Sequence, residues 1–341
     1  MKRRRTIMKL KPVADQVVVI VGCTSGIGRV TAREFAERGA TLLLGARQPA
    51  DLESLANELR ASGARVETHE VDVASFDSVE ALAGFAETTL GRVDTWVQLA
   101  AISLYATFEA TRPEEFRRVI EANLIGQAYG AMAALPRLRR TGGGALIEVS
   151  SVEAEVALPY QSAYAASKHG MAGFLRALRM ELQAEDAPIS VTQVMPSGID
   201  TPLFHNARTK IGVAPKPTAP IYDPIVVARA IVAASEKPVG DLFIGGGGMA
   251  FAMLRRWLPG TSERVLKLIG FSGQRTDRPK NALAPDNLDA PIATTDGERG
   301  GFPGRSWSVA TWAQLHPAAA RTAIVGLLGA AALAARARAT R

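Results

Sequence analysis

Segments with the patterns of strands and helices alternate from residue 17 to about residue 244, and this alternation constrains the fold more than any other feature. Most of the strand-like segments are short apolar runs, as expected for strands that are buried on both faces. They are Val17–Val21, Thr41–Gly45, Arg65–Val71, Val93–Ala100, Ala145–Val149, Ile189–Met195 and Asp241–Ile244. Strands that alternate with helices form right-handed crossovers. The sequence therefore predicts an α/β protein, with a doubly wound parallel sheet of seven strands, helices on both faces and a C-terminal extension.

Composition divides the 341 residues into one folded domain and several flanking segments. The segments are a basic N-terminal tail (1–12), the α/β domain (13–248), an apolar and basic helical extension (249–271), a poorly ordered linker rich in Gly, Pro, Asp and Arg (272–306), and a C-terminal tail with a short apolar helix (307–341). Low hydrophobicity is the reason to expect disorder in the linker. The helical extension is expected to contain two helices divided at Pro259, and it either packs on the domain or lies at a membrane interface.

The net charge of +7 comes from the two ends of the chain. Six basic residues precede Asp15 and four more lie near the C-terminus, so that the residues between them carry a net charge of −3. A body with this charge does not predict a nucleic-acid-binding surface. We expect solvated tails, with peripheral contact to an anionic lipid surface as the alternative.

Secretory and membrane-spanning segments are not expected. No apolar stretch of the length that a signal peptide needs follows the basic start. The uncharged run Thr322–Ala335 has 14 residues, and as a helix it would span about 21 Å, against about 30 Å for a bilayer core. It predicts a packing, partner-binding or surface-lying helix, with a spanning anchor as the minority alternative. The single Cys23 is typical of a reducing compartment, so a cytoplasmic location is expected, with membrane association left open.

A glycine-rich loop lies between the first predicted strand and the first predicted helix. It contains Gly22, Gly26 and Gly28. Glycines in this position permit a tight turn, let backbone N–H groups approach a pyrophosphate, and allow the helix to pack closely on the strand. The pyrophosphate then lies at the helix N-terminus, where free donors and the helix dipole favour negative charge. This placement indicates a dinucleotide site, although an isolated glycine loop is also common in ordinary turns.

The residue after the second strand bears on the choice of cofactor. An acidic side chain there would bind the adenosine ribose of NAD, but the sequence has Arg47. A guanidinium offers two parallel donors to a 2′-phosphate, so the sequence predicts NADP(H) rather than NAD(H). The alternative is that Arg47 is a solvated loop charge. Asp72, after the third strand, is placed to bind the adenine amino group.

A tyrosine, a lysine and a serine form the candidate catalytic group. Tyr164 and Lys168 are four residues apart on a predicted helix and therefore share one face. A nearby ammonium favours the phenolate and lowers a tyrosine pKa from its usual value of about 10. Tyr164 could then exchange a proton with a carbonyl or alcohol oxygen, which Ser151 would hold by a hydrogen bond. The four scattered histidines predict no metal site.

Asn123 falls inside a predicted helix, where asparagine is unfavourable without a specific partner. Its neighbours Ile120, Leu124 and Gln127 suggest that it faces inward, where it could bind a water that leads to Lys168. The alternative is a polar surface residue.

With these motifs in order, the chain resembles the short-chain dehydrogenase/reductase family over roughly Val13 to Ile244. The family's G-x-x-x-G-x-G matches Gly22 to Gly28, its N-x-x-G matches Asn123 to Gly126, and its Ser…Tyr-x-x-x-Lys matches Ser151, Tyr164 and Lys168. The resemblance implies a Rossmann-like catalytic domain, a catalytic tetrad of Asn123, Ser151, Tyr164 and Lys168, and hydride transfer at the nicotinamide. The implied cofactor-binding residues are Gly22, Thr24, Ser25, Gly26, Ile27, Gly28, Arg47, Asp72, Val73, Ala100, Tyr164, Lys168, Pro196 and Thr201.

Three family motifs are altered. The family's N-N-A-G is Gln98–Ala101, the Asn before the serine pair is Glu148, and the P-G motif is Pro196-Ser197. These residues support the sheet and the cofactor pocket in the family, so their change bears on cofactor affinity more than on proton transfer.

The expected function is that of an NADP(H)-dependent oxidoreductase that acts on a carbonyl or secondary alcohol. An apolar small-molecule substrate is expected because nine mostly apolar side chains fall where the family binds substrate: Leu104, Tyr105, Val156, Leu158, Tyr160, Leu203, Phe204, Val213 and Ile221. The family also implies a homo-oligomer through the helices that carry Asn123 and Tyr164. Two alternatives are an epimerase or dehydratase of the extended branch, and a non-catalytic NADP(H)-binding sensor or scaffold that acts through its C-terminal extension.

Overall fold

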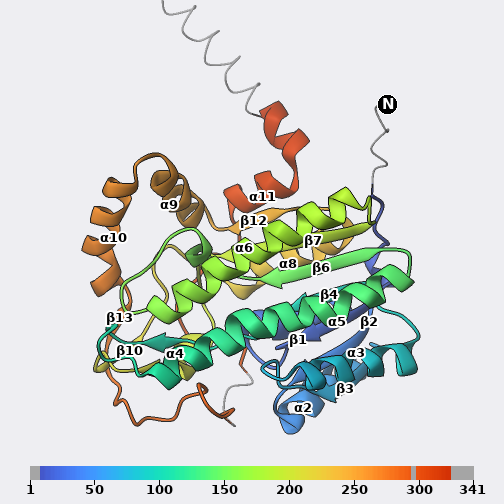
Figure 1. Ribbon diagram of the computed structural model, residues 1–341, viewed down its shortest axis with the longest axis horizontal. Coiled ribbons are helices and arrows are strands. Elements are labelled where there is room, and N and C mark those ends of the chain that lie inside the picture. Colours follow the sequence, from blue (N-terminus) through green and yellow to red (C-terminus); the bar gives the residue numbers. More distant parts are fainter. Residues whose placement is uncertain (1–7, 293–296, 324–341) are drawn as a thin grey trace, which may run out of the picture.

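A seven-stranded parallel sheet forms the centre of the computed structural model, which describes residues 8–292 and 297–323 (Figure 1). In spatial order its strands are β12 (Asp241–Ile244), β7 (Ile189–Pro196), β6 (Gly144–Val149), β4 (Thr95–Gln98), β1 (Val17–Val21), β2 (Thr41–Ala46) and β3 (Val66–Glu70). The strand order changes direction between β1 and β4. In open sheets of this kind, ligands bind beyond the carboxyl ends of the strands at such a switch point. The predicted fold is confirmed.

Helices cover both faces of the sheet because successive strand side chains point to opposite sides. One layer consists of α1 (Gly26–Ala36), α2 (Pro49–Ala61) and α8 (Pro224–Glu236), and the other contains α3 (Phe76–Leu90), α4 (Pro113–Ile120), α5 (Gly126–Arg140) and α6 (Ser162–Ala184). Within β1, Val18 and Ile20 pack toward the first layer, while Val19 and Val21 pack toward the second. Both faces of the strand are therefore fully buried, which explains its uninterrupted apolar sequence.

Short elements surround the carboxyl end of the sheet. They are β5 (Leu104–Tyr105), β8 (Gly198–Ile199), α7 (Leu203–Asn206), β9 (Arg208–Thr209), β10 (Val213–Pro215) and β11 (Ile221–Tyr222). The chain before α8 also contains three short helical turns. Two are 3-10 helices, at Val13–Asp15 and Val152–Ala154, and the third is a π-helical turn at Glu121–Ile125 between α4 and α5.

Two helices of the C-terminal extension lie beyond the sheet, at the left of Figure 1: α9 (Gly246–Trp257) and α10 (Pro259–Gly273). They meet at Pro259, as the sequence predicted. The helix α11 (Val309–Leu315) packs beside β12, and residues 317–323 are also helical. No helix within residues 8–292 and 297–323 is long and apolar enough to cross a bilayer. Most of the predicted apolar helix at Thr322–Ala335, like residues 1–7 of the basic tail, lies outside the described residues.

The segment expected to be a poorly ordered linker is instead bound to the domain over its described residues. It begins with β13 (Arg275–Pro279), which pairs antiparallel with β10. We call the chain that follows, residues 280–292 and 297–305, the strap. Its polar composition suggested disorder, but its charged residues form ion pairs with the domain, for example Arg299 with Asp223. Those partners are distant in sequence, so composition alone could not reveal them.

Candidate functional site

The glycine loop brings the end of β1 and the start of α1 into close contact. Gly22 has a φ of +85°, a conformation that favours glycine. A Cβ on Gly28 would lie 2.0 Å from the carbonyl oxygen of Gly22, so only glycine fits there. The cavity at the carboxyl end of the sheet is lined by the whole predicted loop set: Gly22, Thr24, Ser25, Gly26, Ile27 and Gly28. The glycine loop and the N-terminus of α1 thus form one wall of this cavity.

The remaining predicted cofactor residues line the same cavity. They are Arg47, Asp72, Val73, Ala100, Tyr164, Lys168, Pro196 and Thr201. They come from the ends of four sheet strands (β2, β3, β4 and β7), from the segment after β8 and from α6, because the carboxyl ends of parallel strands meet at one edge of the sheet.

Arg118 on α4 is a cavity residue that the sequence reasoning missed. Burial lowers the pKa of Arg47, and the nearby charge of Arg118 lowers it further, while Asp72 opposes the shift. The two guanidiniums donate to carbonyl oxygens of the strap: Arg47 to Asn287 at 3.4 Å and Arg118 to Leu288 at 3.0 Å. Two cations near one wall of the cavity favour an anionic group there.

The strap also contacts the start of the nucleotide helix. The N–H of Gly26 donates to the carbonyl oxygen of Gly297 at 3.0 Å. Asn287, Pro291 and Ile292 of the strap line the cavity. The strap therefore contributes to the site, and no motif in its sequence indicated this.

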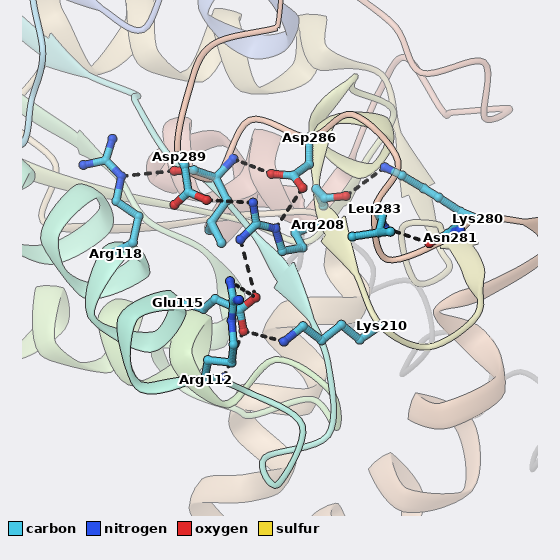
Figure 2. A network of polar contacts seen from close by, with 12 residues as sticks. Arg112, Glu115, Arg118, Arg208, Lys210, Lys280, Asn281, Leu283, Asp286 and Asp289 are labelled. Carbon is cyan, nitrogen blue, oxygen red and sulfur yellow. Dashed lines mark hydrogen bonds and ion pairs between the residues drawn. The ribbon is translucent and has the colours of Figure 1, made fainter.

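Ion pairs hold the strap against α4 and β9 (Figure 2). Arg208 lies at the centre, with Asp286 at 2.8 Å, Asp289 at 2.7 Å and Glu115 at 3.4 Å. Glu115 is almost completely buried and is also paired with Lys210 at 2.6 Å. The first part of the strap is thus fixed beside the cavity by the ion pairs of Arg208 on β9 and by the hydrogen bond of Arg118 on α4.

Ser151, Tyr164 and Lys168 meet at the cavity wall, as their spacing predicted. Ser151 follows β6, and the other two lie in the first two turns of α6. Lys168 is 1% exposed. Its ammonium lies 5.5 Å from the centre of the Tyr164 ring and donates to the carbonyl oxygen of Val149 at 3.2 Å.

The electrostatic environment of Tyr164 differs from the expectation. Burial raises its pKa above the usual value, the carboxyl of Glu153 adds to the rise, and a hydrogen bond with Ser151 opposes it. Burial lowers the pKa of Lys168 to about 8, although Glu148 and Glu153 favour its charged form. The expected lowering of the Tyr164 pKa is therefore not what this environment produces, because burial dominates.

Asn123 does not line the cavity. It is fully buried in the π-helical turn, and both ends of its amide bind the backbone of Ile102: the side-chain oxygen accepts from the N–H at 2.8 Å, and the side-chain nitrogen donates to the carbonyl at 2.8 Å. The inward orientation that the sequence predicted is present. The side chain fixes the loop after β4 through these two hydrogen bonds, and its predicted role in binding a water stays a prediction.

Two residues at the altered family positions make hydrogen bonds that link neighbouring elements. Gln98 accepts from the indole N–H of Trp96 at 3.0 Å and donates to the carbonyl of Gly126 at 3.2 Å, which ties β4 to α5. Ser197 donates to the carbonyl of Ile244 at 2.9 Å. Glu148 is fully buried, and burial raises its pKa well above the usual range.

On the substrate side, only part of the predicted apolar set lines the cavity. Tyr105, Leu158, Leu203 and Phe204 do so. Leu104, Val156, Tyr160, Val213 and Ile221 are not among the lining residues. Several polar lining residues were not anticipated, among them Glu153, Gln161, Lys216 and Gln274. The available sequence signal for Glu153 was a charged residue only two positions after Ser151.

Among residues 8–292 and 297–323, no group of three or more His, Cys, Asp or Glu side chains could hold a metal ion. Cys23 is buried beside the glycine loop, and burial raises the pKa of its thiol to about 12. It is therefore a poor nucleophile in this setting.

Comparison with known sequences places the chain among the oxidoreductases. Residues 16–212 match the sequence model of the family described as short chain dehydrogenase. The uncharacterized oxidoreductase YxnA of Bacillus subtilis is 37% identical over 332 residues, which cover 96% of this chain and 93% of that protein. Dehydrogenase/reductase SDR family member 7B of Bos taurus is 38% identical over 265 residues, covering 74% of this chain and 81% of that protein.

Solved structures share the fold. An alcohol dehydrogenase from the archaeon Thermococcus sibiricus, complexed with 5-hydroxy-NADP, is 28% identical with a TM-score of 0.60, covering 67% of this chain and 95% of that chain. A short chain dehydrogenase/reductase from Burkholderia phymatum, in complex with NAD, has a TM-score of 0.67 at 20% identity, covering 80% of this chain and 100% of that chain. The second likeness concerns the fold alone.

Proposed function

This chain belongs to the short-chain dehydrogenase family, and from that premise we propose that it is an NADP(H)-dependent oxidoreductase that interconverts a ketone or aldehyde and an alcohol. The observation that carries the proposal is the convergence of Ser151, Tyr164 and Lys168 on the cavity that the glycine loop also lines. A nicotinamide bound there supplies the hydride for reduction or accepts it during oxidation.

The residues of the cavity fit such a cofactor. The close packing of Gly28 on Gly22 sets the N-terminus of α1 against the end of β1 at the cavity, where the helix dipole favours a pyrophosphate. In the reductive direction, Ser151 holds the carbonyl oxygen and Tyr164 donates a proton to it as the carbon gains the hydride. Lys168 then stabilises the phenolate that remains on Tyr164.

The choice of NADP(H) is supported by the two guanidiniums of Arg47 and Arg118 near one wall of the cavity. Replacing Arg47 with Leu should weaken NADPH binding about 10- to 100-fold, the loss expected for one charge-assisted hydrogen-bonding group. NADH binding should change less than about threefold. Fluorescence titration with both nucleotides measures this, with Arg60→Ala as a control because Arg60 lies on α2 away from the cavity. Equal losses for NADPH and NADH would contradict the preference.

The proton-transfer role is tested by Tyr164→Phe, which removes only the hydroxyl. Turnover of a panel of apolar ketones and aldehydes with NADPH should fall by about 100-fold or more, the usual contribution of a general acid. NADPH affinity should remain within a few-fold. Tyr129→Phe on α5 is the matched control, because Tyr129 is absent from the cavity wall and packs against Phe76. NADPH binding by the wild-type protein without turnover of any carbonyl would instead favour the sensor or scaffold role.

We further propose that the substrate is largely apolar and reaches the cavity from a membrane surface. Six of the exposed large apolar side chains lie at or beside the junction of α9 and α10 and along α10: Met253, Trp257, Leu258, Leu268, Ile269 and Phe271. Residues 249–271 also carry four basic side chains and one acidic side chain. The side of α10 that faces the domain packs on the loop before α6. There the ring of Phe271, which is partly exposed, lies 5.1 Å from the ring of Tyr160. An apolar, basic surface thus adjoins the substrate side of the cavity, which suits peripheral contact with anionic lipid.

Self-association through α5 and α6 is proposed on the family's precedent. Both helices expose an apolar side chain on the outer surface, Met132 on α5 at 56% and Met180 on α6 at 65%. Light scattering on the purified protein measures the assembly.

A further inference from the structure

Glu153 places a carboxyl group inside the cavity, two residues after Ser151 in the sequence. Its side chain is 4% exposed and lines the cavity with Tyr164 and Lys168. Among the described residues, its Oε2 has no hydrogen-bond partner. A buried carboxyl oxygen without a partner costs on the order of 1–3 kcal/mol. An unsatisfied polar atom that lines a binding cavity therefore points to a ligand group as its partner.

The position of this carboxyl is fixed by its own segment. Glu153 lies in the 3-10 turn Val152–Ala154, and its backbone N–H donates to the hydroxyl oxygen of Ser151 at 3.1 Å. The carboxyl also accepts a hydrogen bond from the backbone N–H of Leu158. The carboxyl thus uses one hydrogen bond to hold its own loop, and Oε2 remains available to a ligand. Because the carboxyl lines the cavity with Tyr164 and Lys168 and interacts electrostatically with both, a group bound to Oε2 would lie close to the proposed reacting carbon.

The charges around Glu153 restrict what can bind. Burial raises the pKa of its carboxyl to about 8, while Leu158 and Lys168 oppose the shift. The side chains that face it are Tyr105 on β5 and Tyr164 and Lys168 on α6. At neutral pH the carboxyl is therefore mostly protonated, and it can both donate and accept a hydrogen bond. A substrate ammonium would add a second buried cation beside Lys168, whereas a neutral hydroxyl would not.

We propose that Glu153 binds a hydroxyl group of the substrate on a carbon next to the reacting one, so that the enzyme acts on hydroxyketones or vicinal diols with an apolar remainder. The inference rests on the proposed function and deepens it. Tyr105 lines the same region at 2% exposure. Gln161, Gln274 and Lys216 add further polar groups to the cavity wall, while Leu158, Leu203 and Phe204 provide an apolar part that would hold the remainder of the substrate.

The test is calorimetric and does not depend on turnover. Decane-1,2-diol and 2-decanol are titrated into the protein–NADPH complex, in which neither alcohol can be oxidised. The wild-type protein should bind the diol about tenfold more tightly, as one additional hydrogen bond to a buried acid predicts. Glu153→Leu should bind both alcohols equally. Glu153→Gln keeps the size and the acceptor for Leu158, and it should retain a reduced preference of about threefold or less.

The matched control is Glu155→Gln, because Glu155 belongs to the same loop but pairs with Arg176 outside the cavity. It should keep the full preference for the diol. A wild-type protein that binds both alcohols equally would overturn the assignment, and so would a preference that is undiminished in both Glu153 variants. Absence of NADPH binding would instead contradict the proposed function. The two alcohols titrated into the protein without nucleotide would then still reveal whether the preference depends on Glu153.

Discussion

At the scale of single residues, close approach of backbone atoms determines the nucleotide loop. Gly28 lies in the first turn of α1, where its missing side chain allows the helix to start directly against the carbonyl of Gly22. Most glycines in helices reduce stability because they are flexible when unfolded. We expect glycine at position 28 to favour stability instead, since any side chain there would force α1 away from β1.

A pair of glycine substitutions separates these effects. Gly28→Ala should destabilise the protein by about 1–3 kcal/mol, the usual cost of overpacking, and lower its Tm by about 5 °C. Gly84→Ala on α3 is the control, because a Cβ there would meet no atom within 4 Å. It should stabilise the helix by about 0.5–1 kcal/mol and raise the Tm. Calorimetry of both variants measures the difference, and an unchanged Tm for Gly28→Ala would show that the loop can relax.

At the scale of elements, the sequence predicted the strands, helices and loops whose signal lies within a short run of consecutive residues. The strand β1 is apolar because both of its faces are buried, and the loop of Gly22 to Gly28 carries its signal in seven consecutive residues. Tyr164 and Lys168 meet because one helix holds both. The electrostatics of Tyr164 were predicted with the wrong direction, because burial and Glu153 arise from packing that a motif does not describe.

The strap shows what local patterns miss. Arg208 and Asp286 are 78 residues apart, and Arg118 and Leu288 are 170 apart. No periodicity links such partners, and the strap has the composition of a disordered linker. Its order comes from ion pairs and backbone hydrogen bonds to other elements. For the same reason, Arg118 and Asn287 could not be recognised from the sequence as cavity residues.

The strap's attachment should therefore depend on Arg208. Arg208→Leu removes the ion-pair partner of Asp286 and one of the cations that pair with Glu115. The free energy that holds the strap on the domain should therefore fall by about 2 kcal/mol. Hydrogen exchange of amides in 281–289 should then accelerate roughly 30-fold, while exchange in β1 stays unchanged. The control is Arg139→Leu, because the pair of Arg139 with Glu185 is exposed and contributes little. Equal exchange in the two variants would mean that other contacts hold the strap.

At the scale of the whole molecule, the distribution of charge and apolar surface is uneven. The residues between the basic tails carry a net charge of −3, yet the segment 249–271 within them has an excess of three basic residues. The same segment exposes Trp257 at 74% and Leu268 at 77%. Figure 1 shows α9 and α10 at one edge of the molecule, beyond the sheet. A surface of this kind can approach a bilayer without burying the remainder of the domain.

Vesicle binding tests this arrangement. The protein should cosediment with vesicles that contain phosphatidylglycerol and much less with pure phosphatidylcholine, because each basic residue near an anionic surface contributes about 1 kcal/mol. Replacing Trp257 and Leu268 together with Ala should reduce binding at least about tenfold, since each buried apolar side chain contributes about 1.5–3 kcal/mol. Phe108→Ala is the control, because Phe108 is 71% exposed but lies outside residues 249–271. A chain that lacks residues 1–7 should bind as well as the full chain. Loss of binding in that shortened chain, with the double variant unaffected, would assign the lipid contact to the basic tail and leave the surface of α9 and α10 free for a second copy of the protein.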